Sequence, residues 1–568
     1  MLAKAKFTTL LALLAVGNLL LAACAPSAAP TGEKGAAPAE KAATGDQIAP
    51  SDKAPKRGGT ITINYGSSWN ADPGMGQTPY TTWYRTGEPM IRRDPVTFEL
   101  QPASFESWKV SPDGKEITLK VRQGVKFHNK PPINGREMEA RDLVYVLKSA
   151  TGLQYPELSP VRFPRKESFK GMIDAVAVDK YTVKVTLENP SVSFLHAMAD
   201  YRGTYVYPDG LREAFGGVES LVAPNPDRSI GAGPFVFTKF TTAVESIFDR
   251  NPTYWQPGKP YLDRVRLLQV ADTSTEQAAF VAKQLDFLSL ATIQAREFVT
   301  KYRKDIQVVT YAPESCWNRL SLNTKRKPFD DYRVRRAVYL VIDKNKIGET
   351  IYGFTLDGKP MWRLPGPLPW PFPEAIPQEE LAKHPLYQGP TPENVAEAKR
   401  LMKEAGYEGG FAFDMHLDRG RSDAAQLIER DLATNLGIKT NLKVVDTETH
   451  RALAARGEYD AQLYCHIHDV TAVAHLAQAF HSKGGRNYGQ YSNPELDALL
   501  DKAEMELDPV KYKALLREIQ TFILDKSLAF LPTRHNMGTV AMQPDVRGAR
   551  FGAGTGYNLG VADWWRDK

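Results

Sequence analysis

The first regular pattern in the chain is an alternation of polar and apolar side chains from Thr60 to Tyr65. A period of two predicts a β-strand with one buried face. Two further strands are predicted, Ser107 to Val110 and Glu116 to Val121, because they flank Pro112-Asp113-Gly114, whose residue types favour a tight turn. The pattern therefore predicts a β-hairpin after an N-terminal strand.

Helical periodicity is clear in several later segments. From Ala140 to Lys148 the apolar residues Leu143, Val144 and Leu147 recur on one helical face. Similar patterns predict helices over Ala396 to Tyr407, Pro494 to Glu506, and Val510 to Asp525. Because such helices alternate with short strands, we expect an α/β fold.

The N-terminus has the pattern of an export signal. Lys4 and Lys6 precede an apolar segment, Phe7 to Gly17, that is shorter than the roughly 18 residues a membrane-spanning helix needs. Small residues and a lone cysteine follow, in Leu21-Ala22-Ala23-Cys24. We predict a signal peptide over residues 1–23, whose removal leaves Cys24 as the first residue of the mature chain. The alternative is an ordinary signal peptide that is cut nearby, with Cys24 discarded or left unmodified.

The composition of residues 24–57 predicts a flexible tether. From Ala25 to Arg57 the chain is rich in Ala, Pro, Gly, Lys and Glu, with no aromatic residue and one branched aliphatic residue, Ile48. Such a segment cannot bury enough apolar surface to offset the entropy of ordering it. Gly58-Gly59 ends the tether, and folded structure is expected to begin there.

Composition limits the class of protein. The chain has 568 residues, of which 42% are hydrophobic and 24% charged, enough for two to four domain-sized units. The formal net charge is +6, yet no dense block of Lys and Arg occurs, so nucleic acid is not an expected partner. Nine Trp residues with many Tyr and Phe are consistent with an aromatic binding cleft.

The chain has three cysteines. With Cys24 set apart as the residue that follows the predicted signal peptide, Cys316 and Cys465 could form a disulfide in an exported compartment or remain as two thiols. The sequence leaves both possibilities open.

Several ordered motifs resemble one known family. These are the hairpin Trp108-x-Val110-x-x-Asp113-Gly114, the segment Val121 to His128, the strand Gly231-Ala-Gly-Pro-Phe235, the stretch Leu322-Asn-Thr to Ala337, and Tyr491-Ser-Asn-Pro to Leu500. At this order and spacing the chain resembles the extracytoplasmic solute-binding proteins of ABC importers, in the peptide, nickel and oligopeptide group. Two positions depart from the family pattern: Val121 stands where Leu is usual, and Lys130-Pro131-Pro132 replaces the common turn. Leu21 to Cys24 also resembles the lipobox of bacterial lipoproteins, which implies that Cys24 carries lipid.

The resemblance implies a two-lobed periplasmic-binding-protein fold with hinge strands and an extra α/β domain inserted in the first lobe. It places lobe I at residues 58–90, 223–321 and 531–568, the extra domain at 91–222, and lobe II at 322–530. The implied function is to bind a solute, foremost a di- or oligopeptide, between the lobes and deliver it to the transmembrane subunits of an ABC permease. An oligosaccharide or a metal chelate is the alternative ligand. The expected protein is an extracytoplasmic, lipid-anchored monomer.

The resemblance also implies candidate ligand residues in lobe II. In peptide-binding relatives a strand like Tyr459 to Ile467 leads to a carboxylate that pairs with the α-amino group of the ligand, and Asp469 falls on that position. His466 stands where the family has Trp. A buried carboxylate facing an ammonium group is a strong orienting contact.

Other candidate ligand residues lie on the hinge and in loops. Trp317 and Asn318 precede the Leu-Asn-Thr motif on a predicted hinge strand that could pair with an extended ligand. Ser67 and Trp69 follow the first strand, in a turn that the resemblance places at the cleft. Arg363, in a Pro-rich loop, is a candidate partner for a ligand carboxylate.

Enzymatic and metal-binding motifs are weak. The sequence has no Gly-x-Ser-x-Gly, no Walker-type loop and no His-Glu-x-x-His, so we expect neither catalysis nor a cofactor. His466 and His468 alternate on a strand, with His475 and His481 downstream, which is a weak pattern for a metal site. A metallohydrolase and a periplasmic chaperone are the distant alternatives.

Overall fold

The computed structural model describes most of the chain that follows the predicted tether. The described residues are 53–65, 80–94, 97–158, 166–200, 204–221, 223–290, 293–311, 317–353, 355–356, 359–466, 469–551 and 560–568. The predicted signal peptide, most of the tether and Cys24 lie outside them. Within these ranges, every helix is too short or too polar to cross a membrane.

A seven-stranded sheet contains the N-terminal strand. β1 (Thr60–Asn64) pairs in parallel with β12 (Arg264–Leu268) and β13 (Phe287–Leu290), and its side chains Ile61 and Ile63 are fully buried. The alternation of the sequence thus correctly predicts this strand. The remaining strands of the sheet are β10 (Phe235–Thr241), β11 (Glu245–Arg250), β14 (Gln307–Tyr311) and β23 (Gly538–Met542).

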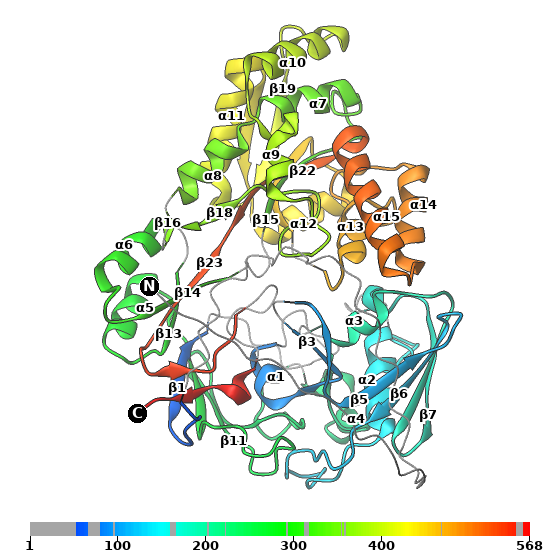
Figure 1. Cartoon of the computed structure of the whole chain (residues 1–568), viewed down its shortest axis with the longest axis vertical. Helices are drawn as coiled ribbons and strands as arrows, with labels where there is room; N and C mark the ends of the chain where they lie inside the picture. The colour runs from blue at the N-terminus through cyan, green and yellow to red at the C-terminus, as the bar shows by residue number, and fades with distance from the viewer. Residues whose placement is uncertain are drawn as a thin grey trace, which may run out of the picture. The chain divides into compact units, whose positions relative to one another are not determined.

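A four-stranded antiparallel sheet contains the predicted hairpin. β5 (Phe105–Val110) and β6 (Glu116–Val121) pair as expected, and the turn places Gly114 at φ +72°, a backbone conformation that glycine adopts without strain. β8 (Thr182–Leu187) and β7 (Met172–Asp179) complete the sheet, and α2 (Ala140–Thr151) packs against both. The hairpin and the helix are both confirmed, and they lie together in Figure 1.

Close backbone contacts link the loop after β6 and the end of α1 to the residues that precede β10 of the seven-stranded sheet. The His128 amide donates to the carbonyl of Gly231 (2.8 Å), and its ring Nε2 lies 3.1 Å from the carbonyl of Gly233. A Cβ atom on Gly231 would lie 2.1 Å from the Thr86 carbonyl oxygen, and one on Gly233 would lie 2.6 Å from that of Gly87. The Gly-x-Gly-Pro motif is therefore required by the close approach of α1 (Tyr80–Thr86) and its following residue.

A six-stranded sheet carries most of the remaining chain. Its order is β18 (Trp362–Arg363), β22 (Phe530–Asn536), β15 (Trp317–Leu322), β21 (Ala461–His466), β19 (Ala412–Leu417) and β20 (Lys439–Val444). One face buries Leu320, Leu463 and Met415 in a core with α7 (Tyr332–Val341), α8 (Lys344–Tyr352), α10 (Pro392–Glu404) and α11 (Ser422–Leu436). The other face carries the polar side chains of Arg319 and Tyr464.

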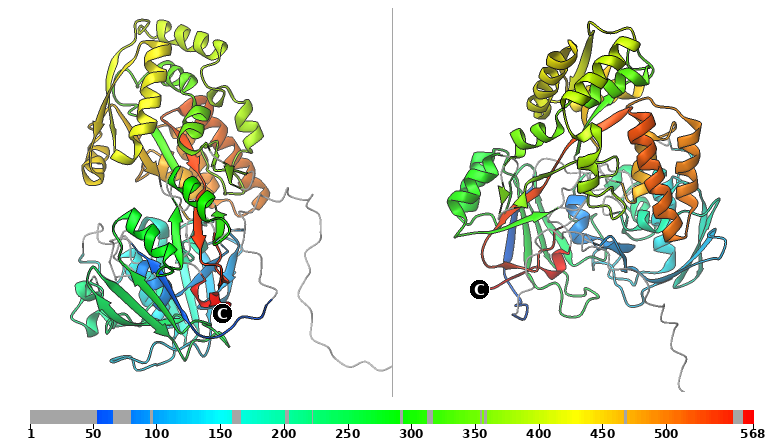
Figure 2. Two further views of the ribbon diagram at one scale, coloured as in Figure 1. Left: turned by 90° about the vertical axis from the view of Figure 1, so that its left-hand side faces the viewer. Right: turned by 45° about the horizontal axis from the view of Figure 1, so that its top comes forward.

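Three helices pack against one another near the six-stranded sheet. They are α13 (Ala472–Phe480), α14 (Pro494–Met505) and α15 (Pro509–Phe522), and they share one apolar core. The ring of Phe480 stacks on that of Phe530 from β22, with centroids 4.1 Å apart. α14 and α15 lie side by side in Figure 2, close to the predicted helix bounds.

The chain passes between the two large sheets at two places. β22 ends at Asn536 in the six-stranded sheet, and β23 begins at Gly538 in the seven-stranded sheet, so Met537 alone separates them (Figure 1). β14 and β15 make the other passage, through residues 312–316, which are not described. Two passages of this kind fit the predicted hinge strands.

The packing refines where segments belong. Leu356 and Met361 lie within the range predicted for lobe II, yet they share a core with Phe280 and Leu288 beside the seven-stranded sheet. The other predicted domain bounds rest on the family resemblance and stay a prediction.

The first and last described residues are held together. Asp567 forms ion pairs with Lys53 Nζ at 2.7 Å and with Lys56 Nζ at 2.9 Å. Arg566 donates to the carbonyl of Thr60 at 2.7 Å. The C-terminal residues thus close over the start of β1.

Candidate functional site

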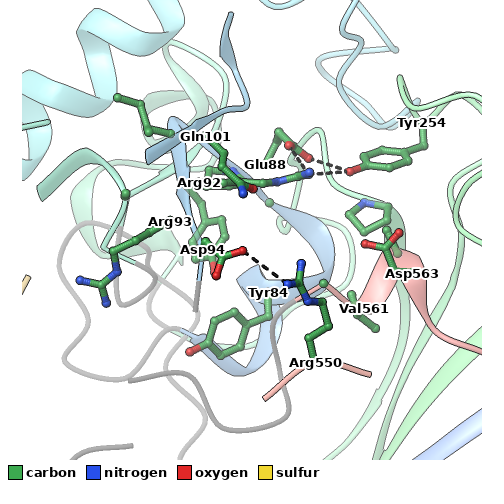
Figure 3. A pocket seen from close by; sticks show the side chains of 18 residues that line it. Tyr84, Glu88, Arg92, Arg93, Asp94, Gln101, Tyr254, Arg550, Val561 and Asp563 are labelled. Carbon is green, nitrogen blue, oxygen red and sulfur yellow. Dashed lines mark hydrogen bonds and ion pairs between the residues drawn. The ribbon is translucent and has the colours of Figure 1, made fainter. Parts of the chain in front are cut away.

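A charged pocket lies where α1, β2 (Glu88–Pro89) and β3 (Ile91–Arg93) meet the C-terminal segment (Figure 3). Its cavity volume is about 170 Å³. Glu88 accepts a 2.6 Å hydrogen bond from Arg92 Nη2 and a 3.1 Å bond from the hydroxyl of Tyr254. Asp94 pairs with Arg550 at 3.5 Å on another wall of the pocket.

Burial controls the electrostatics of this pocket. Glu88 is 1% exposed, and desolvation raises the pKa of its carboxyl although Arg92 beside it opposes the rise. Burial lowers the pKa of Arg92, but Glu88 together with Tyr254 and Asp563 raises it above the usual value. The 2.6 Å contact joins a buried carboxylate to an arginine whose side chain is 33% exposed. The pair fixes the wall of the pocket rather than offering a free charge to a ligand.

Arg93 connects this pocket to the predicted ligand anchor. Its Nη1 atom donates to the carbonyl of Val470 at 2.7 Å, and its guanidinium lies 4.9 Å from the ring centroid of Phe98. Val470 directly follows Asp469 in the chain. The pocket wall and the Asp469 segment are therefore in direct contact.

Asp469 already has a cationic partner. Both carboxylate oxygens lie 3.2 Å from Arg486 Nη1, and the Asp469 side chain is only 13% exposed. A carboxylate can accept several hydrogen bonds. A ligand ammonium group could thus join Arg486 on Asp469 or replace it.

Arg319 lies beneath this ion pair as a fully buried cation. Its guanidinium stacks 4.8 Å from the ring centroid of Tyr488 and 4.4 Å from that of Phe530, and it donates to the Arg486 carbonyl at 2.9 Å. Burial lowers its pKa to about 10, which leaves it protonated at neutral pH. Arg319 therefore supports the chain segment that carries Arg486.

Asn318 is engaged within the protein. Its side chain is buried, and its Oδ1 atom accepts a 2.6 Å hydrogen bond from Arg421 Nε. The hydroxyl of Thr533 donates to its carbonyl at 3.2 Å, across the β15–β22 pair. The structure thus places Asn318 as a link between the sheet and α11, and a contact with ligand would require that link to change.

Arg363 is better placed for an anionic group. It lies on β18, half-buried, with its guanidinium 4.4 Å from the ring centroid of Trp370. Burial lowers its pKa from the ordinary arginine value. Among the ion pairs of the described residues, Arg363 makes no pair with a carboxylate, so a ligand carboxylate would be a suitable partner.

The other predicted residues are described only in part. Trp317 and His466 are paired residues of β15 and β21, so the sheet brings these two positions together, while their side chains fall outside the described set. Ser67, Trp69 and Cys316 also lie outside it. Cys465 belongs to β21, but its side chain is not described, and its pairing with Cys316 stays a prediction.

The predicted histidine pattern does not gather into a metal site in the described part. His475 is buried on α13 with its ring centroid 5.9 Å from that of Phe372, whereas His481 lies 3.8 Å from Asp497. No group of three or more His, Cys, Asp or Glu side chains could hold a metal ion within the ranges that the structure describes.

Sequence reasoning missed four arginines of this region: Arg486, Arg421, Arg93 and Arg319. Their partners are distant in sequence, as for Arg93 and Val470. A signal was available for Arg319 alone, because an arginine at an inward position of a predicted strand must be supported by its surroundings.

Comparisons with known proteins place the chain in a family. The model of the bacterial extracellular solute-binding proteins, family 5, matches residues 99–488. Heme-binding protein A of Haemophilus influenzae is 26% identical over 96% of this chain and 98% of its own length. Di/tripeptide-binding protein 2 of Pseudomonas aeruginosa is 28% identical over 80% of this chain and 85% of its own length.

Solved structures show the same fold. The periplasmic binding protein DppA of Helicobacter pylori, in complex with the peptide STSA, has a TM-score of 0.73 at 22% identity, covering 90% of this chain and 99% of DppA. A dipeptide-binding protein of Pseudoalteromonas has a TM-score of 0.74 at 23% identity, covering 90% of this chain and 100% of its own. The architecture is the mixed α/β periplasmic-binding-protein fold that the resemblance implied. The chain therefore belongs to family 5 of the bacterial extracellular solute-binding proteins.

Proposed function

We propose that this protein captures a short peptide between two lobes and delivers it to an ABC permease, while a lipid on Cys24 holds it at a membrane surface. The observation that supports a peptide most directly is the location of Asp469. Its partly shielded carboxylate lies beside a residue that Arg93 holds from the opposite side of the predicted cleft. A ligand ammonium group is the natural partner for such a carboxylate.

Arg363 completes the proposed recognition. A half-buried guanidinium without a carboxylate among its described ion pairs would attract the other end of a peptide. A ligand with an ammonium and a carboxylate group would then be bound at both ends. The di/tripeptide-binding relative is consistent with this ligand class.

The work of the protein is binding without turnover in this proposal. Contacts made by both lobes favour the closed state only by their differential affinity for it. Hydrolysis of ATP would belong to partner subunits. Oligosaccharides and metal chelates remain alternative ligands, which the same experiment separates from peptides.

The test is calorimetric titration of the purified protein with a set of free di- and tripeptides and their N-acetylated forms. We expect binding of free peptides and at least a tenfold loss of affinity in Asp469→Asn, equivalent to about 1.4 kcal/mol. Glu397→Gln, which removes a surface carboxylate paired with Arg336 at 2.7 Å, is the matched control and should bind as the unmodified protein does.

Two results would contradict the proposal. Equal affinity for free and acetylated peptides would remove the role of Asp469 as the ammonium anchor. Failure of every peptide to bind, with saturable binding of a sugar or a metal chelate, would change the ligand class. Native mass spectrometry of the purified protein gives an independent check, since a copurified ligand should have a peptide mass.

A further inference from the structure

Glu504 is a partly buried residue of α14 whose carboxylate accepts hydrogen bonds from a distant part of the chain. Its Oε1 atom accepts from the hydroxyl of Ser191 at 2.6 Å and from the amide of Ser193 at 3.2 Å. Its Oε2 atom accepts from the hydroxyl of Ser193 at 2.7 Å. The amide of Val192 donates to the Glu504 carbonyl at 3.0 Å, so the whole turn before α3 (Phe194–Met198) is bound to one residue of α14.

The direction of each hydrogen bond follows from counting protons. Ser193 has one hydroxyl proton, which it donates to Glu504, so its contact with Thr471 Oγ1 at 2.7 Å must be a bond donated by Thr471. Thr471 Oγ1 in turn accepts from the amide of Ala474 at 3.2 Å, as the N-cap of α13. The α13 amide, Thr471, Ser193 and the Glu504 carboxylate therefore form one polarised chain.

This series of hydrogen bonds includes Thr471, which lies two residues after Asp469, the proposed ligand anchor. Asp469 is paired with Arg486, Val470 is bound by Arg93, and Thr471 is bound by Ser193. Both Arg93 and Ser193 contact α13 and its preceding residues from the side of the four-stranded sheet. Their bonds therefore fix the position of the segment that presents the Asp469 carboxylate.

We propose that Glu504, Ser191 and Ser193 form a closure contact: they hold the ligand-bound arrangement of the two lobes and position Asp469 for the ligand. The proposal rests on the proposed function, because it assigns residues to the closing step of that function. Glu504 acts as a positioning residue, since it reaches Asp469 only through Ser193 and Thr471.

The contact is built so that it can separate. It combines the hydrogen bonds of Glu504 with limited apolar packing of Phe98 and Val192 against the core that contains Phe372. A cavity of about 310 Å³ lies beside it, lined by residues of both sides. By contrast, Gly231 and Gly233, which precede β10 of the seven-stranded sheet, pack tightly against the backbone at the end of α1. A hinge rotation would therefore part the surface around Glu504 rather than the glycine surface. When it parts, water can replace the three donors to the carboxylate.

The charged groups near Glu504 agree with this role. Burial raises the pKa of the Glu504 carboxyl, while the donated hydrogen bonds from Ser191 and Ser193 and the charge of Lys170 oppose that rise. Tyr512, on α15, also faces this carboxylate. The carboxylate is thus poorly solvated in the structure and depends on its serine donors.

The first experiment compares Glu504→Ala, Ser193→Ala and the control Glu495→Gln, which lies on the same helix with a side chain that is 61% exposed. Hydrogen exchange, measured with and without a saturating free peptide, tests the contact itself. We expect Glu504→Ala to increase amide exchange both in residues 191–194 and in residues 470–474, which the hydrogen bond between Ser193 and Thr471 joins. The control should leave both segments unchanged.

The second experiment measures affinity for the tightest-binding free tripeptide of the calorimetric set. We expect about a tenfold weaker Kd in Glu504→Ala, a smaller loss in Ser193→Ala, and a larger radius of gyration by X-ray scattering with saturating tripeptide. A lowered melting temperature with unchanged affinity and unchanged radius would reduce Glu504 to a structural residue and overturn the proposal. If no tripeptide binds the unmodified protein, the peptide assignment fails, while unchanged hydrogen exchange in Glu504→Ala would separately refute the closure contact.

Discussion

Replacing Glu88 by Gln tests how much the ion pair of the charged pocket contributes to stability. The substitution keeps the size of the side chain but removes its charge, so the Arg92 guanidinium loses an ionised partner at 2.6 Å. Removing one partner of a buried pair typically costs about 3–5 kcal/mol. Because the Gln oxygen can still accept a hydrogen bond from Arg92, and water can reach the 33% exposed Arg92 side chain, we expect about 2 kcal/mol for Glu88→Gln.

Two matched variants separate charge from hydrogen bonding. Tyr254→Phe removes only the 3.1 Å hydrogen bond to Glu88 and its contact with Arg92, and it should cost about 1 kcal/mol. Glu397→Gln breaks a 2.7 Å pair whose carboxylate side chain is 32% exposed, so about 0–1 kcal/mol is expected. The order of the three losses is therefore Glu88, then Tyr254, then Glu397.

Urea unfolding at pH 7, followed by tryptophan fluorescence and circular dichroism, measures these differences. The unfolding midpoint should fall while the slope with urea stays constant, because the surface exposed on unfolding is unchanged. If Glu88→Gln costs no more than Glu397→Gln, burial does not make the pair strong, and the reasoning is refuted.

Two further predictions concern the tether and the core. Cys24→Ala should leave peptide affinity unchanged and abolish retention in the membrane fraction, because the lipid would act on location alone; loss of affinity in solution would contradict this role. Lys344 is buried, donates to the carbonyls of Tyr339 and Leu386, and has its pKa lowered by burial to about 7. Above that pH the unfolded chain binds more protons than the folded one, so Lys344 makes stability rise with pH towards its unfolded pKa near 10.5. The unfolding free energy of the unmodified protein, minus that of Lys344→Met, should therefore increase from pH 7 to 9.5. Parallel curves of unfolding free energy against pH would exclude the effect.

Local patterns in the sequence predicted those strands, turns and helices that are determined by residues close to one another in the chain. The strand at Thr60–Asn64, the hairpin at Gly114 and α2 follow from alternation, turn residues and helical spacing, and all three are present. The end of α15 was less predictable. The α-helical part ends at Phe522, and a π-helical turn follows over Ile523–Ser527. The sequence predicted an α-helix up to Asp525.

The candidate site depended on contacts that no local pattern records. Asp469 was chosen by its position in a motif, but its partner Arg486 lies 17 residues away on a loop. Asn318 was expected to face ligand, whereas Arg421 on the chain before α11 binds its side chain. A strand pattern shows which face a residue occupies, and only the folded chain shows which side chain arrives there.

The pairing of the chain's two described ends has a mechanical consequence. Lys53 and Lys56 bind Asp567, so the segment that leads to the tether and the C-terminus leave the fold at one place. A force applied between the two ends would load these ion pairs and the contact of Arg566 with β1, and it would bypass Met537 at the passage between the sheets. If Cys24 carries the proposed lipid, a pull from that anchor would likewise enter the protein through the seven-stranded sheet and would leave the proposed opening and closing free of tension.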